Sequence, residues 1–369
     1  AQDILPPVAD WKGKSLNLIA NNKDPWITPA EQSGFTTTPG YSETFAWLEK
    51  LCQSTQTMRM ISIGKSASNR DISMVIASVD AIFDREKLAA SAKPLLLIQA
   101  GIHAGEIDGK DAGMMLLRDI ATGKKKNLLQ GVNILVIPIL NVDGHERSSQ
   151  YNRVNQRGPS NMGWRTNARN LNLNRDYAKL DTEEIGAVVT VMNQYSPDLY
   201  LDLHVTDGAD YQYDITYGFS EGYSPAIGHW LKTKLSPAAD QHLRSHGHIP
   251  GPLIFATNGQ DFETGIVEFP YSTRFSNNYG DIRHMPSILV ENHSLKPFRQ
   301  RVLGTYVFLE AVIGVMARES ASLTAAIEQD MNLRAREVVL SWKAADNPDS
   351  LIFLGIQSVR KKSAVTEKD

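Results

Sequence analysis

Short apolar runs alternate with longer amphipathic segments through most of this chain. Runs of roughly four to eight apolar residues bounded by turn residues are typical of strands, and apolar repeats at three and four residues are typical of helices. The pattern predicts strands at 58–64, 71–79, 95–100, 132–140, 198–203 and 287–290. It predicts helices at 41–53, 109–122, 182–195, 224–243 and 296–318. This alternation favours an α/β fold with a mixed, largely parallel central sheet flanked by helices.

The two ends of the chain are patterned differently from the middle. Residues 1–40 are rich in Pro, Asn and Thr, and we expect an irregular arm lying over the main domain, which spans residues 41–320. Residues 321–369 form a C-terminal extension, with a helix predicted at 323–341 and a strand at 349–359. That strand either begins a further domain or adds an edge to the main sheet.

The composition of the chain argues against several classes of function. The chain has 369 residues and a formal net charge of -3, which gives no electrostatic case for nucleic acid or an anionic membrane. No apolar run approaches the roughly 20 residues of a membrane span. The single cysteine, Cys52, excludes an intrachain disulfide and a Cys-based zinc cluster. The start at Ala1, without Met, predicts a removed signal peptide and a periplasmic or secreted location, although cysteine poverty fits a cytosolic protein equally well.

Three of the predicted strands end in residues that bind metals or transfer protons. His103 and Glu106 follow one strand, and His204 and Glu291 end two others. Ligand sites in open α/β sheets form at the carboxyl ends of strands. Two histidines and a glutamate are a ligand set for catalytic zinc with one open position, and a further carboxylate can act as the general base. Each residue alone has an ordinary structural explanation, so their joint placement carries the hypothesis.

A polar loop of about forty residues, 141–181, adds anion-binding chemistry. It carries Arg165, Arg169 and Arg175 among many asparagines. Guanidinium groups bind carboxylates bidentately and can stabilise a developing oxyanion. A loop of this length usually has a functional reason in a compact domain.

The order His-x-x-Glu, Asn-Arg, His, Glu resembles the zinc metallocarboxypeptidase family of carboxypeptidase A, in its bacterial branch. The resemblance covers roughly residues 41–318 and includes Asn141-Val142-Asp143-Gly144, which is similar to the family's Asn-Pro-Asp-Gly turn. It implies a catalytic domain over residues 41–320, one Zn²⁺ per chain, and a peptide substrate with a free C-terminal carboxylate. The site is then expected at the C-terminal ends of the strands.

The resemblance also assigns the reacting groups. His103, Glu106 and His204 match the zinc ligands, and Glu291 matches the general base. The implied activity is zinc-dependent hydrolysis of the C-terminal amide bond of a peptide.

Further matches concern substrate binding. Asn174 and Arg175 match the pair that holds the substrate carboxylate. Arg165 lies nine residues before Asn174, as does the oxyanion-stabilising arginine in the regulatory branch of the family, and Arg169 competes for this role. For the family's mobile tyrosine, Tyr271 is the better placed candidate and Tyr279 the other.

The side-chain pocket and two departures complete the resemblance. Phe275 lies near the position that lines the family's pocket and hints at an apolar or aromatic preference, although Arg274 adjoins it. Asn172 stands where the family commonly has an Asp that orients a ligand histidine, so that histidine is expected to be less basic. Asp176 follows Arg175 where the family often has Asn, and an acid there weakens the pull on a carboxylate.

Two other readings remain open from the sequence. A zinc deacylase of small N-acyl amino acids, of the aspartoacylase or desuccinylase kind, shares the skeleton, but its first motif is expected to read His-Gly-Asn-Glu rather than His103-Ala104-Gly105-Glu106. A non-catalytic, peptidase-like binding module is the other alternative. Retention of Glu291 argues against that module, because non-catalytic relatives usually lose the base.

Overall fold

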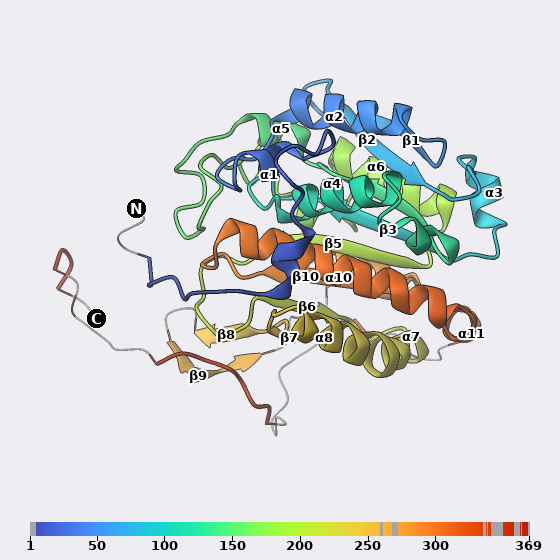
Figure 1. The fold of residues 1–369 in the computed structure, drawn as a ribbon. Coiled ribbons are helices and arrows are strands. Elements are labelled where there is room, and N and C mark those ends of the chain that lie inside the picture. The colour runs from blue at the N-terminus through green and yellow to red at the C-terminus, as the bar shows by residue number, and fades with distance from the viewer. Residues whose placement is uncertain are drawn as a thin grey trace.

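The computed structural model describes residues 5–258, 261–267, 272–334, 337, 339–340, 350–357, 362 and 364–367. Within these residues an eight-stranded sheet has the order β1-β2-β4-β3-β5-β10-β6-β7 (Figure 1). Its strands are β1 (Met58–Lys65), β2 (Asp71–Ala77), β3 (Leu95–Ala100), β4 (Asn133–Ile137), β5 (Leu199–Val205), β6 (Ile215–Phe219), β7 (Pro250–Pro252) and β10 (Ser287–Asn292). β4, β3, β5 and β10 run parallel, and β1, β2 and β6 pair in antiparallel fashion. The predicted mixed, largely parallel sheet is confirmed.

Helices cover both faces of this sheet. The described helices are α1 (Pro29–Gln32), α2 (Tyr41–Gln53), α3 (Arg85–Ala89), α4 (Asp108–Ala121), α5 (Val142–Glu146), α6 (Glu183–Tyr195), α7 (Pro225–Trp230), α8 (Ser236–Ser245), α9 (Ser276–Ile282), α10 (Phe298–Arg318) and α11 (Ser320–Met331). α10 packs between α4 and α8 on one face, and α9 packs on β5 and β10. In Figure 1, α4, α10 and α8 follow one another from top to bottom in front of the sheet, with α6 behind α4.

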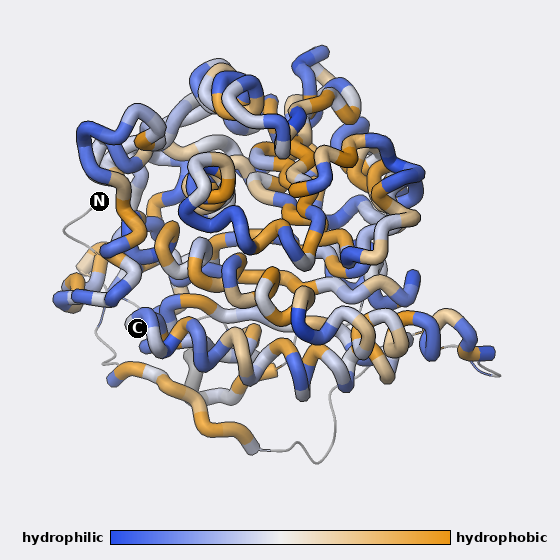
Figure 2. Tube along the Cα trace, turned by 45° about the vertical axis from the view of Figure 1, so that its right-hand side comes forward, coloured by the Kyte–Doolittle hydropathy of each residue, from blue (hydrophilic) through white to orange (hydrophobic). Residues whose placement is uncertain are grey.

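The hydrophobic core explains why the strands are easy to recognise in the sequence. Every residue of β3, β4 and β5 is buried, so these strands are nearly continuous apolar runs, as parallel strands covered on both faces must be. Figure 2 shows apolar segments concentrated inside and polar ones in the outer turns. The pattern does not predict β6, α9 or the separate hairpin of β8 (Phe255–Asn258) and β9 (Asp261–Val267).

Helix α10 lies within the helix predicted at 296–318 and begins two residues later than predicted. Among the described helices it alone is long and apolar enough to cross a bilayer, but 83% of its most apolar window is buried inside the protein. A core helix covered by neighbours on several sides has this composition without any membrane. Its first turn is fixed by Arg301, whose Nε lies 2.8 Å from the Asp108 carboxylate at the start of α4.

The N-terminal arm packs on the domain through polar contacts. Ser15 Oγ lies 2.8 Å from Nε2 of the buried His248, and the indole of Trp11 donates to the carbonyl of Gly247. Further along the arm, the buried Glu31 forms an ion pair with Arg118 of α4. The division of the chain into arm, domain and extension stays a prediction.

The C-terminal extension departs from what the sequence pattern predicts. Helix α11 ends at Met331, well before residue 341, and the predicted strand at 349–359 is absent from its described part, residues 350–357. Instead, Phe353 packs against the rings of Tyr211 and Tyr213, and the Leu354 carbonyl accepts a hydrogen bond from the Gln212 amide. Residues 349, 358 and 359 lie outside the described residues.

Candidate metal centre

Three strand ends converge at one edge of the sheet. After β3, Gly101 adopts φ +68°, a left-handed conformation that suits glycine, and the chain turns through His103 and Glu106 into α4. The Glu106 amide donates to the His103 carbonyl over 2.9 Å, which closes this turn. On the neighbouring parallel strands β5 and β10, His204 and Glu291 stand opposite each other in register.

His103, Glu106 and His204 form a compact, buried donor set. Nδ1 of His103 is 3.1 Å from the Glu106 carboxylate, and Nδ1 of His204 is 2.9 Å from it. One ligand atom from each residue lies within 4.8 Å of the others. A tetrahedral zinc with bonds of about 2.0–2.2 Å places its ligand atoms roughly 3.4 Å apart. The residues present therefore fit a zinc ion.

The outer nitrogens of the two histidines have different partners. Nε2 of His103 donates to Oδ1 of Asn172 over 3.0 Å, so Asn172 is where the resemblance implies. Nε2 of His204 donates to Oδ2 of Asp202 over 2.8 Å. Sequence reasoning missed Asp202, although a residue two positions before His204 on one strand must point to the same face of the sheet.

These contacts shift the pKa values of the two imidazole rings in opposite directions. Burial lowers the pKa of His103, and the attraction of Glu106 only partly offsets this effect. Burial also disfavours the charged form of His204, but the carboxylates of Asp202 and Glu106 outweigh it and raise its pKa well above the usual range. In the metal-free protein, protonation of His204 is therefore favoured over protonation of His103.

Two arginines contact the outer oxygen of Glu106. Nη1 of Arg153 is 2.8 Å and Nη1 of Arg165 is 3.0 Å from Oε1. Arg153 is held by the carbonyls of Val205 and Thr206, at 2.9 Å each. Sequence reasoning missed Arg153, because nothing in the sequence distinguishes it from the other arginines of the polar loop.

Asn174 and several arginine side chains lie beside the donor set. Asn174 Nδ2 lies 3.5 Å from Nε2 of His204, and the Arg175 guanidinium lies 4.5 Å from the centre of the Phe275 ring. Burial and the positive charges of Arg165 and Arg274 lower the pKa of Arg175. Among the described residues, no carboxylate lies within 4.0 Å of the Arg175 guanidinium, so this group is available to an anionic ligand.

One carboxylate oxygen of Glu291 has no partner in the described part of the chain. Its Oε2 is buried and accepts no hydrogen bond from the described residues. Burial, reinforced by the charges of Glu106 and Asp207, raises the pKa of Glu291 to about 8. A carboxyl group of this kind, next to the donor set, is suited to exchanging protons with a bound molecule.

The remaining candidates contact residues outside the donor set or lie outside the described structure. Arg169 pairs with Glu183 at the start of α6. The Tyr279 ring packs against Tyr177, and its hydroxyl accepts from Arg283. Phe275 is 3% exposed beneath the two guanidinium groups of Arg175 and Arg274, which leaves little apolar surface for a substrate side chain. Tyr271 lies outside the described residues.

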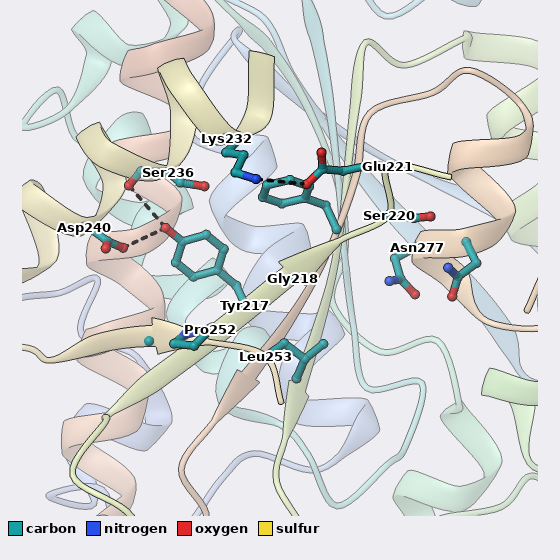
Figure 3. Close-up of a pocket in the computed structure, with 13 residues that line it drawn as sticks. Tyr217, Gly218, Ser220, Glu221, Lys232, Ser236, Asp240, Pro252, Leu253 and Asn277 are labelled. Atoms are coloured by element: carbon teal, nitrogen blue, oxygen red, sulfur yellow. Dashed lines mark hydrogen bonds and ion pairs between the residues drawn. The ribbon is translucent and has the colours of Figure 1, made fainter. Parts of the chain in front are cut away.

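A groove of about 350 Å³ runs along β6 where β7 ends (Figure 3). The Tyr217 hydroxyl donates to Asp240 on one side of the groove, and Asn277 of α9 borders the other. Of the residues described, those that line it include neither the donor set nor Glu291. The groove is therefore distinct from the metal centre.

Comparisons with known proteins identify the family of this chain. The model of the family described as zinc carboxypeptidase matches residues 44–266. The chain belongs to the zinc carboxypeptidase family. Carboxypeptidase 2 of Trichophyton rubrum is 28% identical over 117 residues, a match that spans 31% of this chain and 19% of that protein.

Solved carboxypeptidases have the same fold. Carboxypeptidase A of Helicoverpa armigera superposes with a TM-score of 0.56 at 18% identity, over 78% of this chain and 74% of that chain. A metallo-carboxypeptidase of Burkholderia cenocepacia gives 0.54 at 16% identity, over 75% and 69%. This zinc carboxypeptidase family member thus has the sheet architecture of those enzymes.

Proposed function

We propose that this family member hydrolyses the C-terminal amide bond of peptides, with one zinc ion held by His103, Glu106 and His204. The observation that supports this proposal best is an oxygen of Glu291 that has no partner among the described residues and lies beside a two-histidine, one-carboxylate donor set. A zinc ion bound there supplies Lewis acidity and lowers the pKa of water toward ~7. Everything else in the reaction falls to side chains of this chain.

Glu291 takes the role of general base. Its free oxygen accepts a proton from the attacking water, and the protonated carboxyl then donates to the leaving amine. Its raised pKa supports the second half of this exchange, because an acid that is too strong would not hold the proton until the amine leaves.

Arg175 and Asn174 fix the leaving residue by its carboxylate. The Arg175 guanidinium is oriented by its stacking on Phe275 and by donation from Nη1 to the Asn174 carbonyl over 2.7 Å. A guanidinium without an acidic partner can bind a carboxylate bidentately. Asn174 is held in turn, since its Oδ1 accepts from the Ser276 amide.

Arg165 is proposed as the oxyanion donor. Its side chain is 34% exposed and reaches the donor set from the solvent side, so a substrate carbonyl oxygen can approach it. Arg169 is a weaker candidate, because it pairs with Glu183 at the start of α6, whereas Arg165 contacts Glu106 of the donor set. The roles of Tyr271, Tyr279 and Phe275 toward substrate stay predictions.

A direct test combines metal content with substrate range. The purified chain is assayed for zinc and for cleavage of matched peptides with free and amidated C-termini, together with N-acyl amino acids. Stoichiometric zinc and cleavage of free C-termini only is the expected result. Hydrolysis of N-acyl amino acids alone would favour the deacylase reading, and a chain that binds no added zinc would overturn both.

A further inference from the structure

The two ligand histidines differ in the charge behind them. Asn172, a neutral amide, accepts from the outer nitrogen of His103, whereas Asp202, a carboxylate, accepts from that of His204. Each contact occupies Nε2 and leaves Nδ1 facing Glu106. Both rings are therefore oriented alike, but only His204 has an anion 2.8 Å behind it.

Asp202 is held rigidly in this position. It is fully buried in β5, and its second oxygen accepts from Nε2 of Gln99 over 2.9 Å. Gln99 stands directly opposite Asp202 in the register of β3 and β5. The same amide contacts the hydroxyl of Tyr177, which lies 2.6 Å from that of Tyr200. This buried polar chain keeps the carboxylate from turning away from the imidazole.

The surroundings of Glu106 increase the importance of Asp202 for metal binding. Oε1 of Glu106 already receives hydrogen bonds from Arg153 and Arg165, which offset its negative charge. A divalent cation placed among the three ligands would therefore gain less from Glu106 than from an unpaired carboxylate. The carboxylate of Asp202 compensates for this weaker attraction. Because it accepts a hydrogen bond from His204, it makes the imidazole a stronger electron-pair donor to the metal.

We propose that Asp202 is the positioning residue of the metal centre: it fixes the Nδ1 donor tautomer of His204 and makes this histidine the stronger of the two nitrogen ligands. This inference rests on the proposed zinc site, but not on peptide hydrolysis. His103, supported by Asn172 alone, is the weaker ligand. The carboxylate expected behind the first histidine is thus found behind the second.

The test moves the negative charge from position 202 to position 172. Zinc dissociation constants are measured by chelator competition at one pH for the wild type, Asp202→Asn, Asn172→Asp and the double variant. Asp202→Asn should weaken zinc binding by roughly 10–100-fold, the usual effect of losing such a partner. Asn172→Asp should tighten it, and the double variant should return toward the wild type, because the anion then supports the other histidine. A purely structural role for Asp202 predicts no such rescue.

Thermal unfolding of the metal-free variants separates folding from metal affinity. If Asp202→Asn binds zinc within twofold of the wild type, or if Asn172→Asp fails to tighten binding, the proposal is wrong. The second variant keeps the test decisive even where Asp202→Asn does not fold. A wild-type chain that binds zinc tightly but cleaves no peptide would contradict the proposed function and leave this inference standing.

Discussion

Glu291 lies directly opposite His204 in the parallel register of β10 and β5. Paired residues on adjacent strands point to the same face of the sheet, so the carboxyl group is brought beside the donor set by backbone hydrogen bonding alone. The backbone position of Glu291 is therefore fixed by the sheet. Its Oε2 has no described partner to compete for a proton.

Replacing Glu291 by Gln should abolish most turnover without releasing the metal. The amide keeps the shape but cannot accept the proton of water, so we expect kcat to fall by roughly 10²–10⁴. Zinc content should stay stoichiometric, because Glu291 is not among the ligands. The exposed Glu328→Gln serves as the matched control, and a fully active Glu291→Gln enzyme would show that another group is the base.

Arg175→Ala should impair binding of substrates with free C-termini. The loss of a bidentate partner should raise KM by roughly 10–100-fold, with kcat less affected, because the guanidinium contacts the carboxylate and not the scissile bond. Arg169→Ala is the control, since that arginine lies in the same loop and pairs with Glu183. Equal effects of both changes would argue against a specific carboxylate site at Arg175.

Zinc affinity should fall as the medium is acidified. In the metal-free protein the pKa of His204 is raised because Asp202 and Glu106 outweigh burial, and the proton must leave before Nδ1 can bind a metal. Below that pKa the apparent affinity should drop by up to about tenfold per pH unit. Calorimetric titration in buffers of different ionisation enthalpy should detect the released proton, and an affinity independent of pH would contradict the assignment.

His145 should make folding sensitive to mild acid. Burial, followed by the charge of Lys110, lowers the pKa of His145 from 6.5 to about 4. Because its folded pKa is depressed, its contribution is present above pH 6.5 and is lost as the pH falls toward 4, by up to about 3 kcal/mol. Urea unfolding of wild type and His145→Gln at both ends of this range measures the difference, and parallel pH profiles would contradict it.

Gly105 should tolerate no side chain. A Cβ atom there would lie 2.6 Å from Cδ of Arg153 and 2.8 Å from the Gly163 carbonyl oxygen. Gly105→Ala should therefore push Arg153 off Glu106 and lower kcat/KM by more than about tenfold. Gly113→Ala is the control, because its nearest neighbour would be at 3.6 Å, and alanine suits the interior of α4. Unchanged activity of Gly105→Ala would assign Arg153 a purely structural role.

The local pattern of apolar and polar residues predicted most of the fold. β3 and α2 have the predicted boundaries, and the other predicted elements up to residue 318 are shifted by a few residues at their ends. Strands buried on both faces need continuous apolar runs, and this requirement is visible in any sequence. β6 was missed because Gly218 and polar neighbours interrupt its apolar run. The strand predicted at 349–359 was wrong over residues 350–357, where Phe353 packs against the rings of Tyr211 and Tyr213.

The sequence by itself determined which residue types stand at the strand ends: two histidines and two glutamates, each placed by a local apolar run that ends beside it. Only the tertiary structure decided which distant residues hold them in place. The register of β3 and β5 brings Gln99 against Asp202, and a loop folds back to bring Arg153 onto Glu106. These two contacts join residues 103 and 47 positions apart in the sequence, and no local periodicity encodes such contacts.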